Sequence, residues 1–194
     1  MMESYKEIFN KKGKSVKSLK WNSYSSAASR YKQFIDGNVD YNGKNILDVG
    51  CGFGDIIPYL FSQAESFQYT GIDMMPEFIK IARKRYPDFK FFVSDYFSNP
   101  LKKKFDIIIS CGTLNTKIPG YMKYREKAIK TMFDNCKEVL AFNMAGGSNP
   151  KNKKESKISY ADSLAVLKYC LSLTNKVVFK QHYHRRDFTV FLYK

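Results

Sequence analysis

The segment from Ile46 to Asp55 constrains the fold of this chain more than any other part of the sequence. It reads Ile-Leu-Asp-Val-Gly-Cys-Gly-Phe-Gly-Asp, an apolar run followed directly by glycine at three alternate positions. Glycine lets the backbone turn sharply and approach a ligand without a Cβ clash, and the first turn of a following helix offers unpaired N–H groups. A buried strand, a glycine turn and a helix in this order predict the first unit of an open α/β sheet with a ligand site at its edge.

From Lys44 onward, short apolar runs alternate with helical segments, which predicts βαβ units. We expect a Rossmann-like, seven-stranded, mostly parallel sheet. The predicted strands are Asn45–Val49, Gln68–Ile72, Phe89–Val93, Phe105–Ser110, Glu138–Asn143, Lys176–Gln181 and Phe188–Tyr193. The predicted helices of this part of the chain are Gly54–Ser62, Pro76–Tyr86, Tyr121–Asn135 and Ala161–Leu173.

Two connections between these elements refine the topology. The stretch Ser94–Lys104 is too short for a crossover helix, so we expect a loop or a single turn there. The last two strands are separated by about six residues, which allow a hairpin but not a parallel crossover. The sheet is therefore expected to end in an antiparallel C-terminal strand pair.

Residues 1–40 predict an N-terminal helical extension that caps a domain of residues 41–194, all within a single structural domain. In this cap we expect helices at Ser4–Phe9 and Ser23–Ile35. The lysine-rich stretch Lys11–Lys20 between them is expected to be a solvated loop.

Composition limits the classes of function. The apolar runs are far shorter than the roughly 20 residues of a membrane-spanning helix, and the N-terminus does not resemble a secretory signal, so we expect a soluble, cytoplasmic protein without a membrane span. Four scattered cysteines and two histidines show no metal-ligand spacing, and no metal site is expected. The net charge of +15 favours an anionic partner such as nucleic acid, but only six of the 33 basic residues are arginine, so a compositional lysine bias is the alternative.

The spacing of the glycines and of three aspartates indicates the type of ligand. Dinucleotide-binding enzymes use G-x-G-x-x-G, whereas this chain has G-x-G-x-G with Asp48 two residues before the first glycine. A carboxylate there suits the cationic ammonium group of S-adenosylmethionine better than a pyrophosphate. Asp73 ends the second strand, where it can bind both ribose hydroxyls, and Asp95 ends the third, where it can bind the adenine amino group. We expect Met74 and Tyr96 to flank the adenine.

With these motifs the chain resembles the class I S-adenosylmethionine-dependent methyltransferases from Lys44 to Lys194. The resemblance implies S-adenosyl-L-methionine as cofactor, S-adenosyl-L-homocysteine as product and a reversed last strand. It also implies that the cofactor lies at the ends of the first four strands. The residues expected to contact it there are Asp48, Gly50, Cys51, Gly52, Gly54, Asp73, Met74, Asp95, Tyr96 and Cys111.

Three shorter pieces, Cys111–Asn115, Ala141–Met144 and Asp187–Lys194, resemble a group of small bacterial and archaeal methyltransferases whose acceptors are mostly unassigned. Members of that group carry a Ser/Arg pair in an N-terminal helix, which corresponds to Ser29 and Arg30. The resemblance thus implies that Arg30 binds the methionyl carboxylate of the cofactor through a charge-assisted contact. A surface arginine on the helix is the alternative.

Methyl transfer is an in-line displacement at an activated carbon, so positioning of the two reactants supplies much of the catalysis. A base is needed only when the acceptor must lose a proton. The polar candidates near the expected mouth of the site are Asn115, Tyr121, His182 and His184, of which a histidine is best suited to take up that proton. A solvated hairpin tip is the alternative for both histidines.

These observations favour an O- or N-methyltransferase that acts on a small-molecule or sugar-like acceptor beneath a lid formed by Gly146–Lys157 and Lys17–Ser29. The fourth strand lacks the [DNS]-P-P-[YFW] element of enzymes that methylate amino groups of DNA, which argues against that class. Two alternatives stay open. One is a methyltransferase of RNA such as tRNA, with the lysines as a phosphate track. The other is a non-catalytic protein that keeps the cofactor fold as an interaction module.

Overall fold

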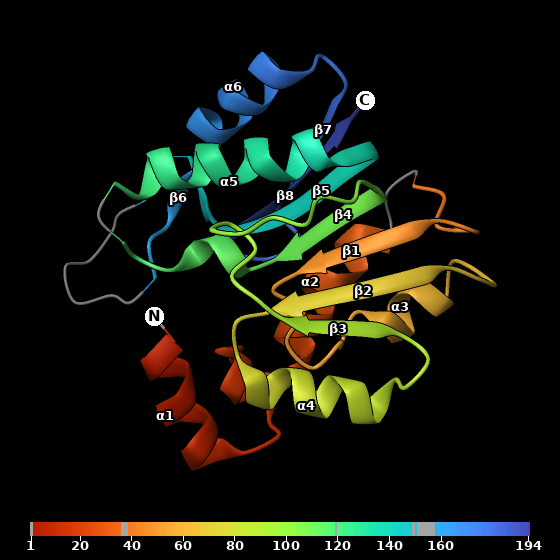
Figure 1. Ribbon diagram of the computed structural model, residues 1–194. Coiled ribbons are helices and arrows are strands. Elements are labelled where there is room, and N and C mark those ends of the chain that lie inside the picture. Colours follow the sequence, from red (N-terminus) through yellow and green to blue (C-terminus); the bar gives the residue numbers. More distant parts are fainter. Residues whose placement is uncertain (1, 36–38, 119, 149, 151–157) are drawn as a thin grey trace.

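A mixed β-sheet with helices on both faces forms the centre of the structure, a computed structural model that describes residues 2–35, 39–118, 120–148, 150 and 158–194 (Figure 1). In the described part of the chain the sheet has the strand order β3-β2-β1-β4-β5-β8-β7, with a short strand β6 beside β5. The strands are β1 Asn45–Val49, β2 Gln68–Asp73, β3 Lys90–Val93, β4 Phe105–Cys111, β5 Cys136–Gly147, β6 Ala161–Asp162, β7 Val177–Gln181 and β8 Asp187–Tyr193.

The topology confirms the Rossmann-like prediction. Strands β1 to β5 pair in parallel, whereas β8 runs antiparallel to both β5 and β7. The antiparallel C-terminal pair is therefore present, as the short connection between the last two strands requires. Strand β6 adds an eighth strand to the seven that the sequence predicts, because Gly146 and Gly147 of β5 pair in parallel with Ala161 and Asp162.

The helices cover the two faces of the sheet in separate groups. Helices α5 and α6 pack on one face, and α2, α3 and α4 contribute to the core on the other. Successive side chains of β4 point to opposite faces of the sheet. Ile108 packs in the core beneath α5 and α6, whereas Ile107 and Ile109 pack in the core beneath α2, α3 and α4. The helical elements are α1 Met2–Lys12, η1 Val16–Leu19, α2 Tyr24–Ile35, α3 Ile57–Phe61, α4 Pro76–Arg85, η2 Thr113–Asn115, α5 Tyr121–Asn135 and α6 Ser163–Leu173.

Of the element boundaries that differ from the prediction, three have identifiable reasons. Helix α3 begins at Ile57 rather than at residue 54, because Gly54 has a left-handed φ of 75° and still belongs to the turn. Helix α6 begins at Ser163, because Asp162 is its N-cap and accepts hydrogen bonds from two backbone N–H groups of the first turn. Strand β5 extends to Gly147, since its last residues pair with β6.

The cap, here residues 2–35, is more ordered than the sequence predicts. The expected solvated loop at Lys11–Lys20 contains the single turn η1, whose Val16 and Ser18 are buried. This correction has a local cause, because the side chain of Ser15 caps the turn and an apolar valine then faces the domain. Leu19, the last residue of η1, packs with α1 against a small core cluster of Phe53, Met75 and Phe78.

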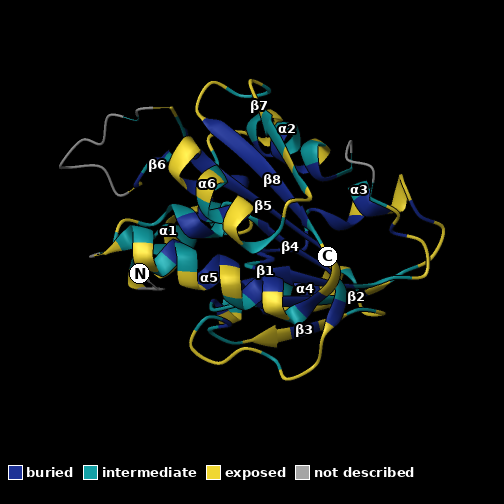
Figure 2. Ribbon diagram, turned by 90° about the horizontal axis from the view of Figure 1, so that it is seen from above, coloured by how far each residue is buried: buried dark blue, intermediate teal, exposed yellow. Residues whose placement is uncertain are grey.

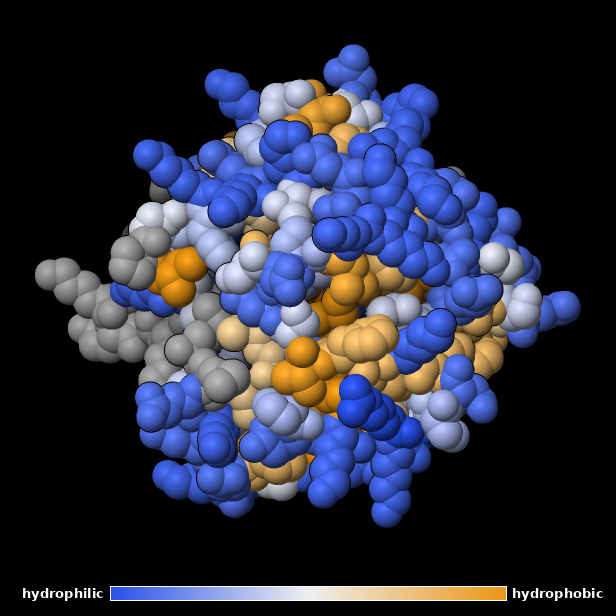
Figure 3. Space-filling model, in the orientation of Figure 1, coloured by the Kyte–Doolittle hydropathy of each residue, from blue (hydrophilic) through white to orange (hydrophobic). Residues whose placement is uncertain are grey.

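The expected loop between β3 and β4 is confirmed, and it leaves one part of the sheet without a helix. Figure 2 shows the central strands β4, β5 and β8 as buried, in contrast to the partly exposed edge strand β3. Phe92 and Val93 of β3 are 44% and 47% exposed. Figure 3 shows hydrophobic side chains gathered in the middle of the side of the molecule that faces the viewer in Figure 1, surrounded by hydrophilic residues.

None of the helices in the described ranges combines the length and the apolar character that crossing a bilayer requires.

Candidate functional site

A cavity of about 550 Å³ lies at the carboxyl ends of β1 to β4. Its walls come from these strand ends, from the cap, and from the turn between β7 and β8. Figure 1 shows how the fold brings the strand ends together, since the arrowheads of neighbouring parallel strands lie at one edge of the sheet beside α1. The predicted site residues that line it are Arg30, Asp48, Gly50, Cys51, Gly52, Asp73, Met74, Asp95, Tyr96, Cys111, Asn115 and His184.

The glycine turn brings bare backbone to the cavity. The N–H groups of Gly50 and Cys51 donate to the carbonyl of Ile72 at 2.7 and 3.0 Å, which ties the turn to β2. A Cβ on Gly50 would lie 2.2 Å from Oγ1 of Thr113, and one on Gly52 would lie 2.8 Å from Cδ2 of Leu19. Both glycines also have positive φ, so backbone conformation and close neighbours each require the absence of a side chain.

Asp48 is a buried acid at the end of β1, with 4% of its surface exposed. One of its carboxylate oxygens accepts a hydrogen bond of 2.6 Å from the hydroxyl of Tyr69. Burial raises the pKa of Asp48 to about 7; the Tyr69 bond opposes this rise, and the charges of Asp73 and Asp55 add to it. A cationic ligand group beside this carboxyl would favour its ionised form, so the residue is suited to an ammonium group.

Asp73 and Asp95 are oriented by the backbone around them. Asp73 accepts hydrogen bonds from the N–H groups of Gly52 at 3.0 Å and Met75 at 2.9 Å. Burial raises its pKa, and these backbone bonds oppose the rise. Asp95 accepts from the N–H of Phe97 and the hydroxyl of Ser98, so it closes its own turn as well as lining the cavity. Each carboxylate oxygen has lone-pair capacity left for a ligand hydroxyl or amine.

The cysteines and the tyrosine at this end of the cavity contribute shape rather than reactivity. Burial raises the pKa of the Cys51 and Cys111 thiols, so both stay protonated and pack as small apolar groups. Tyr96 lines the cavity, yet its ring belongs mainly to the core beneath α5.

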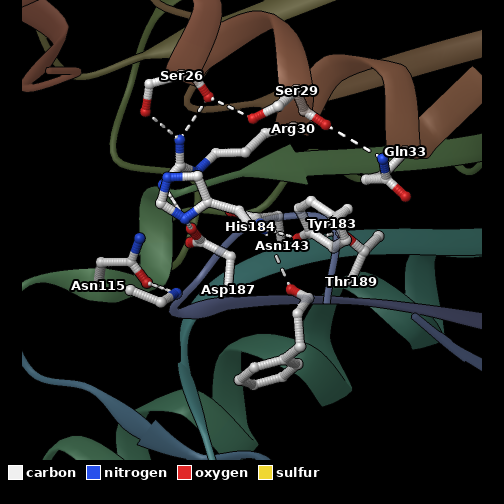
Figure 4. A network of polar contacts seen from close by, with 12 residues as sticks. Ser26, Ser29, Arg30, Gln33, Asn115, Asn143, Tyr183, His184, Asp187 and Thr189 are labelled. Atoms are coloured by element: carbon white, nitrogen blue, oxygen red, sulfur yellow. Dashed lines mark hydrogen bonds and ion pairs between the residues drawn. The ribbon is translucent and has the colours of Figure 1, made fainter. Parts of the chain in front are cut away.

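Arg30 of the cap forms a buried ion pair with Asp187, the first residue of β8, with side chains that are 8% and 2% exposed (Figure 4). Its guanidinium also donates to the backbone carbonyl and the hydroxyl of Ser26, and it lies 4.8 Å from the ring centroid of Trp21. Arg30 is therefore not the surface arginine of the alternative reading. Its charge is neutralised within the protein, so its binding of a cofactor carboxylate stays a prediction.

His184 contacts the same carboxylate oxygen of Asp187 as Arg30 does, and its Nδ1 also lies 3.4 Å from a guanidinium nitrogen of Arg30. Its Nδ1 is 2.5 Å from an oxygen of Asp187, and the imidazole is about one-third exposed. Because a carboxylate accepts and does not donate, Nδ1 donates to Asp187, and in a neutral imidazole the lone pair is then on Nε2. Burial raises the pKa of Asp187, and the charges of Arg30 and His184 oppose this rise.

Asn115 of η2 is the second predicted catalytic residue at the cavity. Its side-chain oxygen accepts a hydrogen bond of 2.8 Å from the backbone N–H of Ala145 in β5. This contact fixes which way the amide faces, so that its NH₂ group is available as a donor.

The remaining predicted site residues do not line the cavity. Gly54 lies behind the turn, where a Cβ would meet Ile57 and Tyr86 at 3.1 Å. Tyr121 begins α5 beneath the guanidinium of Arg125, and His182 is exposed in the β7–β8 turn with a φ of 79°. In the predicted lid Gly146–Lys157, residue 149 and residues 151–157 lie outside the described residues.

The structure also adds residues that sequence reasoning did not single out. The cap contributes Tyr5, Leu19, Trp21 and Asn22 to the cavity, three of them within the predicted lid segment Lys17–Ser29. The role of Asp187 could not be predicted from the sequence, because its partner Arg30 is 157 residues away in the chain. The charges of Arg185 and Arg186 were visible in the sequence, but their position at the cavity was not.

Comparison with known proteins gives a consistent picture. The methyltransferase-domain family matches residues 46–142, which is half of the chain. A protein of Invertebrate iridescent virus 6 named as methyltransferase 235L is 35% identical over 79 residues, covering 41% of this chain and 30% of that protein. A Mycobacterium tuberculosis protein named as methyltransferase Rv1506c is 24% identical over 156 residues, covering 77% and 93%. The chain thus spans less than a third of the viral relative but most of the mycobacterial one.

Among solved structures, magnesium protoporphyrin IX methyltransferase from Synechocystis PCC 6803, solved with bound S-adenosylmethionine, superposes with a TM-score of 0.69. The alignment covers 100% of this chain and 96% of that chain at 13% sequence identity. At this identity the likeness concerns the fold.

Replacement of Asp48 by asparagine is expected to stabilise the ligand-free protein. Because the folded protein raises the pKa of Asp48 from 3.8 to about 7, it holds a proton that the unfolded chain has lost, and stability falls as pH rises through this window. Asp48→Asn removes that loss. In urea unfolding we expect a gain on the order of 1 to 4 kcal/mol at pH 8 and a smaller gain at pH 5.

Asp106→Asn is the matched control with the opposite sign. Partial burial opposes the shift, but hydrogen bonds from Lys137 and Asn45 lower the pKa of Asp106 to about 2, so its ionised form is favoured by folding. Loss of this carboxylate should reduce stability at pH 8. An Asp48→Asn variant no more stable than the wild type at pH 8 would contradict the assigned burial cost.

Proposed function

This chain belongs to the methyltransferase-domain family, and on that premise we propose that it transfers the methyl group of S-adenosyl-L-methionine to an oxygen or nitrogen atom of a small-molecule acceptor. The observation that carries the acceptor class is the cavity of about 550 Å³, which is bounded by strand ends, the cap and a hairpin turn. Its size is typical of pockets that enclose most of a small ligand, which run from roughly 300 to 1,000 Å³.

In this proposal the acids at the strand ends hold the cofactor. Asp48 binds the ammonium group, Asp73 the ribose hydroxyls and Asp95 the adenine amino group, with Met74 beside the adenine. The glycine turn supplies the close backbone approach. The support is geometric, since all four side chains line one cavity and follow the order of the strands.

The acceptor end is assigned to Asn115 and His184. A lone pair of the acceptor attacks the methyl carbon, the carbon–sulfur bond breaks, and S-adenosyl-L-homocysteine leaves with the bonding electrons on sulfur. A proton lost from an acceptor O–H or N–H passes to Nε2 of His184, whose tautomer Asp187 fixes. The NH₂ group of Asn115 donates to the acceptor and helps to orient it.

The two alternatives are less well supported. An RNA substrate would have to insert a flipped base past the cap, and a cavity partly covered by the cap and the hairpin turn favours a free small molecule. A non-catalytic module would have no use for a buried acid whose pKa is raised to about 7, because such a residue only reduces stability.

Cofactor binding tests the enzyme assignment. We expect saturating S-adenosyl-L-homocysteine to raise the Tm of the wild type by about 5 to 10 °C, since ligand binding stabilises the folded state by mass action. Asp73→Ala should weaken the ligand by at least about tenfold, through loss of charge-assisted hydrogen bonds. Asp134→Ala, an exposed α5 acid paired with Lys130, is the control and should bind normally. The absence of a Tm shift with either S-adenosylmethionine or its product would favour the non-catalytic module.

The acceptor class is tested by product formation at different salt concentrations. Purified protein is incubated with S-adenosylmethionine and either a pool of small hydroxyl, amine and sugar compounds or tRNA, and S-adenosyl-L-homocysteine is quantified. We expect turnover on a small compound that changes less than about twofold between about 50 and about 200 mM salt, whereas binding through the many backbone phosphates of a tRNA would weaken by orders of magnitude. Turnover on tRNA alone, with that steep salt dependence, would reject the small-molecule proposal.

His184→Gln tests the proton acceptor, and its neighbour His182 offers a matched control in the same turn. On the acceptor found above, His184→Gln should lower kcat by about 10²- to 10⁴-fold, the usual contribution of a general base, with little change in cofactor affinity. His182→Gln should keep the wild-type kcat, because His182 does not line the cavity. Equal kcat for both variants and the wild type would remove His184 from the mechanism.

A further inference from the structure

The chain uses arginine sparingly, and the few arginines it has are not equivalent. Six of the 33 basic residues are arginine. Four of them hold parts of the protein together. Arg83 donates to the carbonyl of Phe91, Arg85 pairs with Asp55, Arg125 donates to the carbonyls of Leu114 and Ser159, and Arg30 pairs with Asp187.

The remaining two, Arg185 and Arg186, both line the cavity. Their guanidinium groups are exposed and form no hydrogen bond or ion pair with any residue that the structure describes. That of Arg186 lies 5.5 Å from the ring centroid of Tyr160, another cavity residue. In a chain that uses lysine almost everywhere else, the arginines without a hydrogen-bond or ion-pair partner among the described residues are therefore concentrated at one place.

The backbone that carries these two arginines is anchored on both sides. The carbonyl of Arg186 accepts a hydrogen bond of 3.0 Å from the N–H of Gly146 in β5. The next residue, Asp187, is held by the buried ion pair with Arg30, and His184 contacts the same carboxylate. The side chains thus extend from a fixed base beside the proposed proton acceptor.

Charge is distributed unevenly around the cavity. Asp48 lies in β1, Asp73 ends β2 and Asp95 follows β3, so these three acids are on the side assigned to the cofactor. Among the described residues on the hairpin side of the cavity, the acid is Asp187, and Arg30 neutralises it. Within the same described part of the chain, the charges of Arg185 and Arg186 have no ion-pair partner.

We propose that the acceptor carries an anionic group, a carboxylate or a phosphate, which Arg185 and Arg186 bind while the nucleophilic atom lies near His184. The planar guanidinium fork matches the geometry of both groups and binds them through paired, charge-assisted hydrogen bonds. This inference rests on the proposed function and narrows it from any small molecule to an anionic one. An acceptor held at its charged end by the hairpin would be oriented for attack from its other end.

The test uses the full-length protein saturated with S-adenosyl-L-homocysteine, titrated at constant ionic strength with inorganic pyrophosphate or with citrate. Trp21 is the sole tryptophan and lines the cavity, so its fluorescence reports occupancy. We expect saturable binding of at least one probe, and the better probe distinguishes a phosphate from a carboxylate preference. In the double variant Arg185→Gln/Arg186→Gln, binding of that probe should weaken by at least about tenfold, with unchanged affinity for S-adenosyl-L-homocysteine.

Lys123→Gln/Lys127→Gln on α5 is the matched control, because it removes the same amount of charge from exposed positions outside the cavity. It should bind the probe within about twofold of the wild type, since exposed charges at a distance are largely screened.

Four results would overturn the inference. These are the absence of saturable binding by either probe, equal weakening in the control, loss of S-adenosyl-L-homocysteine affinity in the arginine variant, and arginine-dependent binding of tRNA without binding of the small anions. Failure of the wild type to bind S-adenosyl-L-homocysteine would instead overturn the proposed function itself. The two failures are therefore distinguishable in one set of titrations.

Discussion

The buried ion pair between Arg30 and Asp187 connects the cap to the hairpin of β7 and β8. Both of these parts of the chain line the cavity. Arg30 lies in α2 of the cap and Asp187 is the first residue of β8, so the pair holds α2 against the start of β8. Removal of one partner from such a pair leaves an uncompensated buried charge, which typically destabilises a protein by about 3 to 5 kcal/mol. The same carboxylate orients His184, so a contact that maintains the architecture also sets the chemistry of the acceptor end.

The cofactor side follows a different physical principle. Parallel strands deliver their carboxyl ends to one edge of the sheet, and an acid at each end then faces a common space. Asp73 and Asp95 are stabilised there by backbone N–H groups. Among the described residues, Asp48 accepts a side-chain hydrogen bond from the Tyr69 hydroxyl alone, and burial raises its pKa, so folding opposes its charge. A residue that reduces stability without a structural benefit is typical of a site selected for binding.

Local patterns made most of the fold predictable, and long-range contacts account for what was missed. The apolar runs at Asn45–Val49 and Phe105–Ser110 identified strands because each is short, bounded and rich in branched residues. The two residues of β6 are too few to show a period, and the burial of Val16 depends on a domain surface that the sequence does not display. Among site residues, Asp48 and Asp73 could be found from their distance to the glycines. The Arg30–Asp187 pair could not, because these two ordinary charges lie 157 positions apart in the sequence.

The packing of the cap on the glycine turn has a kinetic consequence. Leu19 occupies the space that a side chain on Gly52 would need, and Tyr5, Phe9 and Leu19 rest on a cluster of only three buried residues. Segments with few buried contacts separate from a domain at a far lower free energy than global unfolding requires. A ligand beneath Tyr5 and Phe9 would therefore exchange through partial detachment of α1, while Val16 of η1 stays packed in the main core and the sheet stays intact. In an enzyme built this way, release of the spent cofactor rather than the bond-making step can limit turnover.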